Sequence, residues 1–208
     1  MDSYLVPAGY GEAEYVEKRS RFIGQVWRVE SEAEARERIE ESRRRYHDCR
    51  HNCWCYAIRE GNILRYTDGG EPQGTAGQPM LNVLLKEEVT NAVCVVTRYF
   101  GGILLGAGGL TRAYGGTAKL ALDAAGISRM RLWAVLLVPC AYSLYERMRL
   151  LVEKSGGMVE NADFGADVVL TVLLPSEDVP SFQAAVTDLS AGTVEVLVEE
   201  EKFQPGPV

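Results

Sequence analysis

The chain has 208 residues, of which 47% are hydrophobic and 25% are charged, and its formal net charge is −7. This composition is typical of a soluble globular protein with one large core or two smaller ones, and it excludes a disordered chain. The acidic balance also argues against a histone-like protein that binds nucleic acid by electrostatics alone. The longest apolar run, 132–142, is too short to span a bilayer, and the first residues lack the features of a signal peptide. We therefore expect a cytoplasmic protein with no membrane partner.

The charge is unevenly distributed along the chain. Residues 1–128 contain 16 Lys and Arg against 17 Asp and Glu, whereas the remainder contains 6 against 12, so the two parts net −1 and −6. We therefore expect a polyanion to bind the less acidic first part. Arginines cluster within it, partly offset by acids, and this cluster is either a solvated helix face or a polyanion contact. Its members are Arg36, Arg38, Arg43, Arg44, Arg45 and Arg50.

The first elements predicted are two strands within 15–29, joined around Ser20, and a helix that follows. Ser31 and Glu34 have the spacing of a capping box, which places the start of this helix at residue 31. Two further strands, 53–59 and 63–66, form a hairpin that turns at 60–62.

The segment HDCRHNCWC places His47, Cys49, His51, Cys53 and Cys55 at alternate positions, so on a strand they share one face. Neighbouring members could both contact one zinc ion, but five residues on a straight strand do not converge, and a second Cys pair is absent. A Cys53 nucleophile assisted by His51 is equally poorly placed, because side chains at i and i+2 stand parallel. We expect reduced cysteines packed under a sheet, with no disulfide, no metal, no cofactor and no catalytic residue.

A loop with two prolines and four glycines, DGGEPQGTAGQP, covers 68–79 and excludes regular structure, and a short helix is predicted at 80–86. Asp68 and Glu71 could flank a site in this loop. Two acids in one loop do not, however, define a reaction.

The segment RYFGGILLGAGGLTRAY joins a buried strand, 91–100, to a helix that begins near residue 109 or 110 and stops at Gly126. The first-turn amides of this helix have no helical acceptors and favour an anion. Arg98 ends the strand, and Arg112 and Lys119 fall on the polar face of the helix. The spacing matches neither GxGxxG nor a P-loop, and such a loop also occurs in proteins that bind nothing there. Its five glycines are Gly101, Gly102, Gly106, Gly108 and Gly109.

The pattern restarts after Gly126. Strands at 131–139, 158–164, 168–174 and 193–203, with helices at 143–155 and 179–189, give the order βαββαβ of a ferredoxin-like sandwich. The sequence therefore predicts an α+β protein of two α/β-sandwich domains, 1–128 and 129–208.

The motifs DGGEPQGTAGQP and RYFGGILLGAGGLTRAY together resemble the signature of the YigZ/IMPACT family, and KRSRFIG and HNCWCY also resemble family segments. The resemblance implies that the first domain is an Impact-type N-terminal domain like domain IV of elongation factor G, which has a ribosomal-protein-type βαβ fold. It implies that the second domain resembles the small C-terminal domain of bacterial members and domain V of that factor. It also implies a cytosolic role near translation, since eukaryotic relatives regulate the stress control of translation through protein contacts.

Our leading hypothesis is a non-catalytic regulator that binds RNA, the ribosome or a ribosome-associated protein through the face made by the two loops. The alternative is an enzyme or binder of a small phosphorylated metabolite at the same loop, and a protein-only adaptor is a third reading. We expect no DNA specificity, and the oligomeric state stays open. The candidate binding residues are Arg98, Gly101, Gly102, Gly106, Gly108, Gly109, Arg112, Lys119, Asp68, Glu71, Gly74, Thr75, Gly77 and His51.

Overall fold

The computed structural model describes residues 3–206. They divide into two compact units, one formed mainly by Tyr4–Arg129 and the other mainly by Met130–Gln204. Within the described residues, every helix is too short or too polar to cross a membrane.

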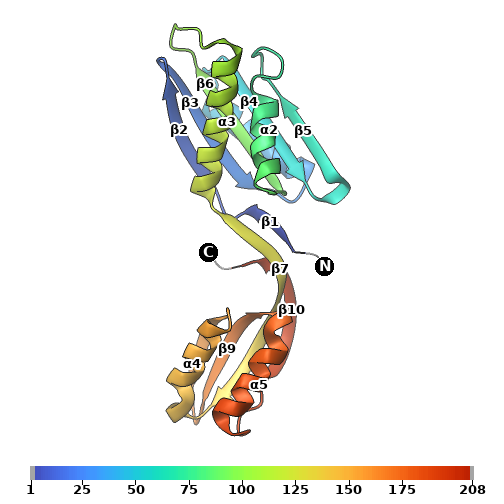
Figure 1. Cartoon of the computed structure of the whole chain (residues 1–208), viewed down its shortest axis with the longest axis vertical. Coiled ribbons are helices and arrows are strands. Elements are labelled where there is room, and N and C mark those ends of the chain that lie inside the picture. Colours follow the sequence, from blue (N-terminus) through green and yellow to red (C-terminus); the bar gives the residue numbers. More distant parts are fainter. Residues whose placement is uncertain (1–2, 207–208) are drawn as a thin grey trace. The chain divides into compact units, whose positions relative to one another are not determined.

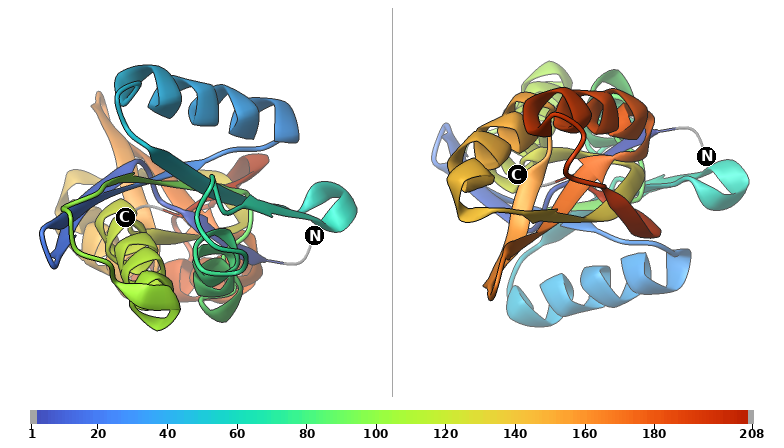
Figure 2. Two further views of the ribbon diagram at one scale, coloured as in Figure 1. Left: turned by 90° about the horizontal axis from the view of Figure 1, so that it is seen from above. Right: turned by 90° about the horizontal axis from the view of Figure 1, so that it is seen from below.

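The Tyr4–Arg129 unit is built on a five-stranded sheet in the order β2-β3-β6-β4-β5 (Figure 1). Each strand pairs antiparallel with its neighbours. Helix α1 covers one face of this sheet, and α2 and α3 cover the other (Figure 2). The element bounds are β1 Tyr4–Pro7, β2 Gly11–Glu17, β3 Ser20–Arg28, α1 Glu32–Arg45, β4 His51–Ile58, β5 Ile63–Thr67, α2 Gly77–Lys86, β6 Ala92–Tyr99 and α3 Gly106–Ala125.

The covered faces explain why the central strands are so apolar. Strand β6 is buried from Ala92 to Arg98 because helices lie on both sides of it. In β4, Cys53 and Cys55 enter the core under α2 and α3, while Tyr56 enters the core under α1. The cysteines of the described chain are free, and the two in β4 pack as small apolar side chains.

The predicted capping box of α1 is confirmed. The backbone N–H of Glu34 donates to Oγ of Ser31 over 3.2 Å, and the side chain of Glu34 accepts from the N–H of Glu30 over 2.9 Å. The reciprocal bond therefore reaches one residue further back than in the usual motif.

Two helices begin earlier than the sequence predicts. Helix α3 begins at Gly106 instead of 109 or 110, although its first turn is rich in glycine and its buried face begins only at Leu110. Helix α2 begins at Gly77 instead of Met80. The carboxylate of Asp68 accepts from the N–H groups of Ala76 and Gly77, over 3.0 and 2.9 Å, and so supplies a cap from nine residues away in the chain.

The Met130–Gln204 unit has the predicted βαββαβ order and the strand order β10-β7-β9-β8 of a ferredoxin-like sandwich. The side chains of Met148 and Val152 from α4, and of Phe182 and Val186 from α5, pack on one face of this sheet. The predicted fold class, α+β with two sandwich units, is thus confirmed. The bounds are β7 Ile127–Cys140, α4 Tyr145–Lys154, β8 Met158–Phe164, β9 Val168–Pro175, α5 Val179–Ser190 and β10 Leu197–Pro205.

Candidate functional site

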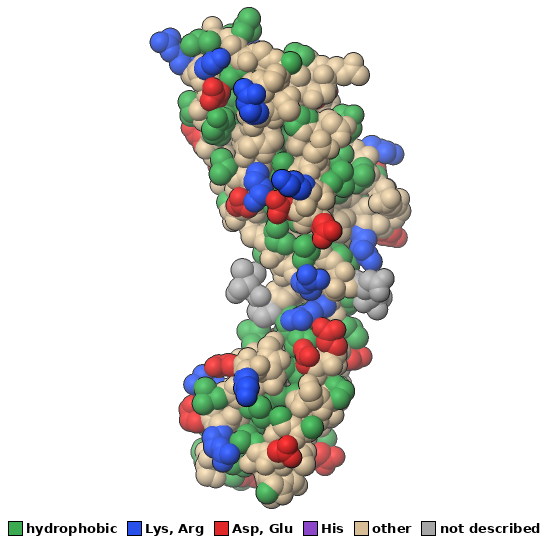
Figure 3. Space-filling view, viewed as in Figure 1, with side chains coloured by type: hydrophobic (Ala, Val, Ile, Leu, Met, Phe, Trp, Pro, Cys, Tyr) green, Lys and Arg blue, Asp and Glu red, His purple; other side chains and the backbone are tan. Residues whose placement is uncertain are grey.

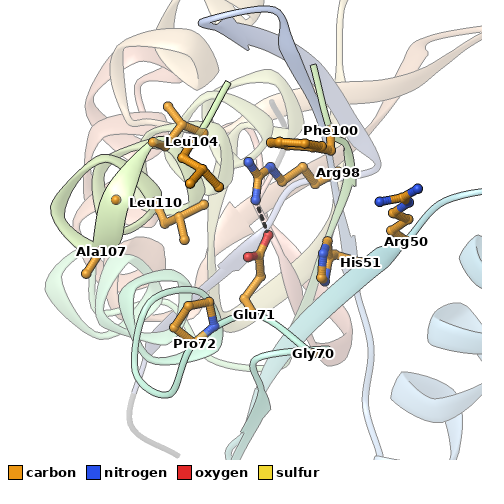
Figure 4. Close-up of a pocket in the computed structure, with 12 residues that line it drawn as sticks. Arg50, His51, Gly70, Glu71, Pro72, Arg98, Phe100, Leu104, Ala107 and Leu110 are labelled. Carbon is orange, nitrogen blue, oxygen red and sulfur yellow. Dashed lines mark hydrogen bonds and ion pairs between the residues drawn. The ribbon is translucent and has the colours of Figure 1, made fainter. Parts of the chain in front are cut away.

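A cavity of about 390 Å³ lies at the end of the Tyr4–Arg129 unit where the two predicted loops meet (Figure 4). The 68–79 loop, the start of β4, the end of β6 and the start of α3 all contribute to its wall. We call this feature the loop cavity. It is lined by Arg50, His51, Gly70, Glu71, Pro72, Arg98, Phe100, Leu104, Leu105, Gly106, Ala107 and Leu110.

Arg98 and Glu71 form an ion pair in the wall of the loop cavity, with 2.7 Å between Nη1 and Oε1 (Figure 4). Their side chains are only 5% and 4% exposed. Nη2 of Arg98 also donates to Oγ of Ser20, and the hydroxyl of Tyr114 donates to Glu71 over 2.8 Å. The expectation that Arg98 offers a free guanidinium to an anion is therefore wrong, since its charge is neutralised inside the fold.

Asp68 has a structural role that the sequence did not reveal. Besides the two bonds at the start of α2, its carboxylate accepts from the N–H of Gly74 over 2.8 Å. The buried hydroxyl of Thr75 donates to the carbonyl of Pro72, and a methyl group on Gly77 would lie 2.6 Å from the carbonyl oxygen of Thr67. These residues hold the 68–79 loop in shape and do not present donors to a ligand.

The five glycines of the second loop have different environments. A methyl group on Gly101 would lie 2.1 Å from the backbone of Arg19, so only glycine fits there, and one on Gly109 would lie 3.1 Å from the Leu105 side chain. Gly102 and Gly106 have φ values of +83° and +70° and open space around them, and Gly108 is also nearly open.

The start of α3 is the strongest anion-attracting feature of the site. No side chain caps it and no acid lies in its first turn, while Gly106 and Ala107 line the loop cavity. The first-turn amides of this 20-residue helix therefore keep their partial positive charge.

Arg112 and Lys119 are placed differently along α3. Arg112 is exposed, and its Nη1 would lie 3.6 Å from a methyl group on Gly108. Lys119 instead pairs with Asp123 and with Glu87 over 3.7 Å. It lies 13 residues beyond Gly106, or about 20 Å along the helix. The prediction that Lys119 belongs to the binding site is therefore wrong.

His51 is a candidate binding residue from the sequence, whereas Arg50 is not. Both line the cavity, and Nδ1 of His51 lies 3.2 Å from the carbonyl oxygen of Gly69. The backbone of Arg19 lies against Gly101. Within residues 3–206 the side chains of Arg19, Arg50 and Arg112 have no carboxylate within ion-pair distance. On the face drawn in Figure 3, Lys and Arg side chains are present at this end of the unit and also further along it, interspersed with Asp and Glu.

The site also has an apolar component. Leu104 is 83% exposed, and Phe100 and Ile103 are 40% and 41% exposed. The short apolar runs in the glycine loop are the sequence signal for this apolar surface, which the candidate residues do not include.

The nearby thiol and phenol are poorly suited to catalysis. Burial raises the pKa of the Cys53 thiol to about 12, and its Sγ donates to the carbonyl of Asp68 over 3.0 Å. Burial, with the neighbouring Cys53 and Glu71, also raises the pKa of Tyr114. Both groups hold their protons at neutral pH, so neither is a ready nucleophile. Across the described residues, no three His, Cys, Asp or Glu side chains are grouped to hold a metal ion.

Fold and site together define a two-domain α+β protein whose first unit has an open, partly apolar cavity at the start of an uncapped helix. The model of the Impact N-terminal domain matches residues 18–122, and that of a domain of unknown function, DUF1949, matches residues 138–193. The chain belongs to the IMPACT family, as the motifs indicated.

Similar proteins cover nearly the whole chain. IMPACT family member YigZ of Escherichia coli is 36% identical over 97% of this chain and 100% of its own. IMPACT family member YvyE of Bacillus subtilis is 34% identical over 94% of this chain and 91% of its own. A crystal structure of a hypothetical protein, 35% identical, aligns with 96% of this chain and 98% of its own at a TM-score of 0.60.

Proposed function

We propose that this protein is a non-catalytic regulator of translation that binds RNA, free or in the ribosome, through the face around the loop cavity. One observation carries the proposal: two arginines that have no carboxylate partner among the described residues lie near the uncapped start of α3, Arg50 in the wall of the loop cavity and Arg112 beside Gly108. A chain whose net charge is −7 here has a local excess of positive charge. Guanidinium groups and helix N-terminal amides are standard phosphate ligands.

The apolar wall of the loop cavity supports RNA as the polyanion. Unpaired bases stack on aromatic side chains and on guanidinium planes, so a partly exposed Phe100 in the same cavity wall as Arg50 suits a single-stranded segment. A link to translation is what family membership implies. The absence of an activated nucleophile near the cavity agrees with recognition and not turnover.

Sedimentation of the purified protein with ribosomes, across salt concentrations and with and without nuclease, tests the proposal. The double variant Arg50→Glu/Arg112→Glu should lose association, because it reverses two charges at the cavity without disturbing the buried Arg98–Glu71 pair. Each lost phosphate contact should reduce the slope of log K against log salt by about 0.7 on single strands.

A matched control makes the same charge change elsewhere. Arg147 and Lys154 are exposed residues of α4, and Arg147→Glu/Lys154→Glu should sediment like the unmodified protein. Equal losses from both double variants would mean that net charge, and not the cavity face, controls association. Association that survives both nuclease and the Arg50→Glu/Arg112→Glu change would point to a protein partner instead.

A second candidate, a small phosphorylated metabolite, is favoured by the volume of the cavity. About 390 Å³ lies within the usual range for ligand pockets of about 300–1,000 Å³. A nucleotide or sugar phosphate at a hundred times its dissociation constant should stabilise the fold by about 2.7 kcal/mol, which a thermal-shift screen would detect. Unchanged melting temperatures across the screen would exclude this candidate.

A further inference from the structure

A second groove lies on the opposite face of the same sheet, between α1 and strands β4 and β5. Its volume is about 480 Å³, and we call it the α1 groove. In β4, alternate side chains point to opposite faces, so His51 lines the loop cavity whereas Trp54 lines the α1 groove. Helix α1 lies alone on this side of the sheet (Figure 2).

The α1 groove is rich in positive charge. Three arginines line it, Arg36 and Arg43 from α1 and Arg65 from β5, against one acid, Glu40. Glu40 pairs with Arg43 over 2.5 Å, and Arg36 lies 3.4 Å from Glu32. Arg65 donates to the backbone carbonyl of Leu64 over 3.1 Å. It pairs with no carboxylate among the described residues, so its charge is not neutralised.

The base of the groove is aromatic. The rings of Trp54 and Tyr56 stack with their centroids 5.5 Å apart and their planes inclined by 8°. Tyr56 is buried and Trp54 is partly exposed, so the indole is the ring that a ligand can reach.

Trp54 also carries an unsatisfied donor. Its Nε1 is buried and has no hydrogen-bond acceptor among the described residues. A buried donor without a partner costs stability, and in native structures such groups are rare. A ligand acceptor that reached this N–H would recover the cost.

We propose that the α1 groove binds a nucleotide unit, with the base against the Trp54 indole and the phosphate between Arg43 and Arg65. Base stacking on an aromatic ring and charge-assisted bonds from guanidinium forks are the two interactions that nucleotides combine. An acidic peptide would use the arginines but has no base to stack on the exposed part of the indole. The nucleotide can be free or part of a single strand, since both present the same base and phosphate. This site uses none of the loop-cavity residues, so it is independent of the function proposed above.

The test measures binding of two fluorescent probes, a labelled ATP analogue and a short labelled single-stranded RNA, by polarisation at fixed salt. The double variant Arg43→Glu/Arg65→Glu should weaken binding of whichever probe is the ligand by at least about tenfold. Trp54→Leu should weaken it by about tenfold, whereas Trp54→Phe, which retains a ring stacked on Tyr56, should retain most of the affinity.

The matched control is Arg38→Glu/Arg44→Glu, which makes the same charge change with two exposed arginines, both on α1, that do not line the groove. It should bind like the unmodified protein. Circular dichroism of every variant confirms that the fold is retained.

The outcomes distinguish a free nucleotide from a nucleic-acid strand, and the α1 groove from the loop cavity. Weakened ATP binding assigns a free nucleotide, and weakened RNA binding alone assigns a strand. If neither probe binds the unmodified protein, if both double variants weaken binding equally, or if Trp54→Leu has no effect, the α1 groove is not a nucleotide site. RNA binding that responds to Arg50→Glu/Arg112→Glu but not to Arg43→Glu/Arg65→Glu overturns the groove and leaves the loop cavity standing.

Discussion

The two loops that border the loop cavity use their polar groups in opposite ways. In the 68–79 loop, Asp68 and Glu71 accept hydrogen bonds from backbone amides, Arg98 and Tyr114 of the same unit. In the 101–109 segment, the first-turn amides of α3 have no capping side chain, and Arg112 has no carboxylate partner within the described part of the chain. Of the charged residues in the two motifs, Asp68, Glu71 and Arg98 therefore support the site from within, whereas Arg112 is exposed.

The largest expected effect comes from breaking the buried ion pair. Glu71→Ala should lower the free energy of unfolding of the first unit by about 3–5 kcal/mol, because it leaves the Arg98 guanidinium buried and unpaired. Urea denaturation measures the change. Glu14→Ala is the control, since Glu14 pairs with Arg21 at the exposed surface and should cost less than about 1 kcal/mol. Equal losses of unfolding free energy in the two variants would contradict the difference expected between a buried and an exposed ion pair.

The next effect concerns Asp68. Asp68→Ala removes three charge-assisted bonds to backbone N–H groups and the cap of α2, and should cost about 2–3 kcal/mol in the same assay. Asp123→Ala, which removes an exposed carboxylate paired with Lys119, should be nearly neutral. A stability loss below about 0.5 kcal/mol for Asp68→Ala would mean that this acid is free for a ligand.

Gly101→Ala tests the close approach of the two backbones. The added methyl group would lie 2.1 Å from the carbonyl carbon and oxygen of Arg19, so the loop must move, at a cost of about 1–3 kcal/mol. The measurement is again urea denaturation. A variant as stable as the unmodified protein would show that this loop adapts freely.

The buried thiol gives stability a pH dependence. The pKa of Cys53 is raised to about 12 in the folded protein from an ordinary value of 9.0. Between these values the unfolded chain releases the proton and the folded chain retains it, so stability falls as pH rises. The loss for this group is at most about 1.4 kcal/mol per pH unit. Cys53→Ala should have a correspondingly shallower slope between pH 9 and 11, and identical slopes would refute the assignment.

The smallest effect should have the opposite sign. Gly108→Ala places a better helix former in the first turn of α3, where only Arg112 lies near, and should stabilise the unit by about 0.5–1 kcal/mol. Destabilisation would show that this glycine is required by the fold. Together with Gly101→Ala, the variant separates glycines that the fold needs from glycines that leave the helix start open.

Much of the architecture could be predicted from the pattern of the chain. The βαββαβ order, the capping box at Ser31, the buried cysteines of β4 and the family motifs are local or periodic signals. The helix start at Gly77 was missed because a distant carboxylate caps it, and α3 begins at Gly106, before the apolar positions that signal a helix in the sequence.

The candidate site was predicted less well than the fold. The sequence places Arg98 and Arg112 at two ends of one motif, and their roles look equivalent. Glu71 is 27 residues away from Arg98, and no spacing rule predicts that the pair is buried. Arg50 comes from another part of the chain and joins the site only because β4 pairs with β6.

The sequence by itself determined the two-unit α+β fold, the family and the two motifs, because periodic apolar positions and turn residues act over short stretches of chain. The tertiary structure alone decided which charges are available to a ligand. Packing brings Glu71 and Ser20 onto Arg98, whereas Arg50 and Arg112 have no such partners among residues 3–206. Electrostatic roles depend on neighbours in space and on burial, and these exist only once the sheet and helices have assembled.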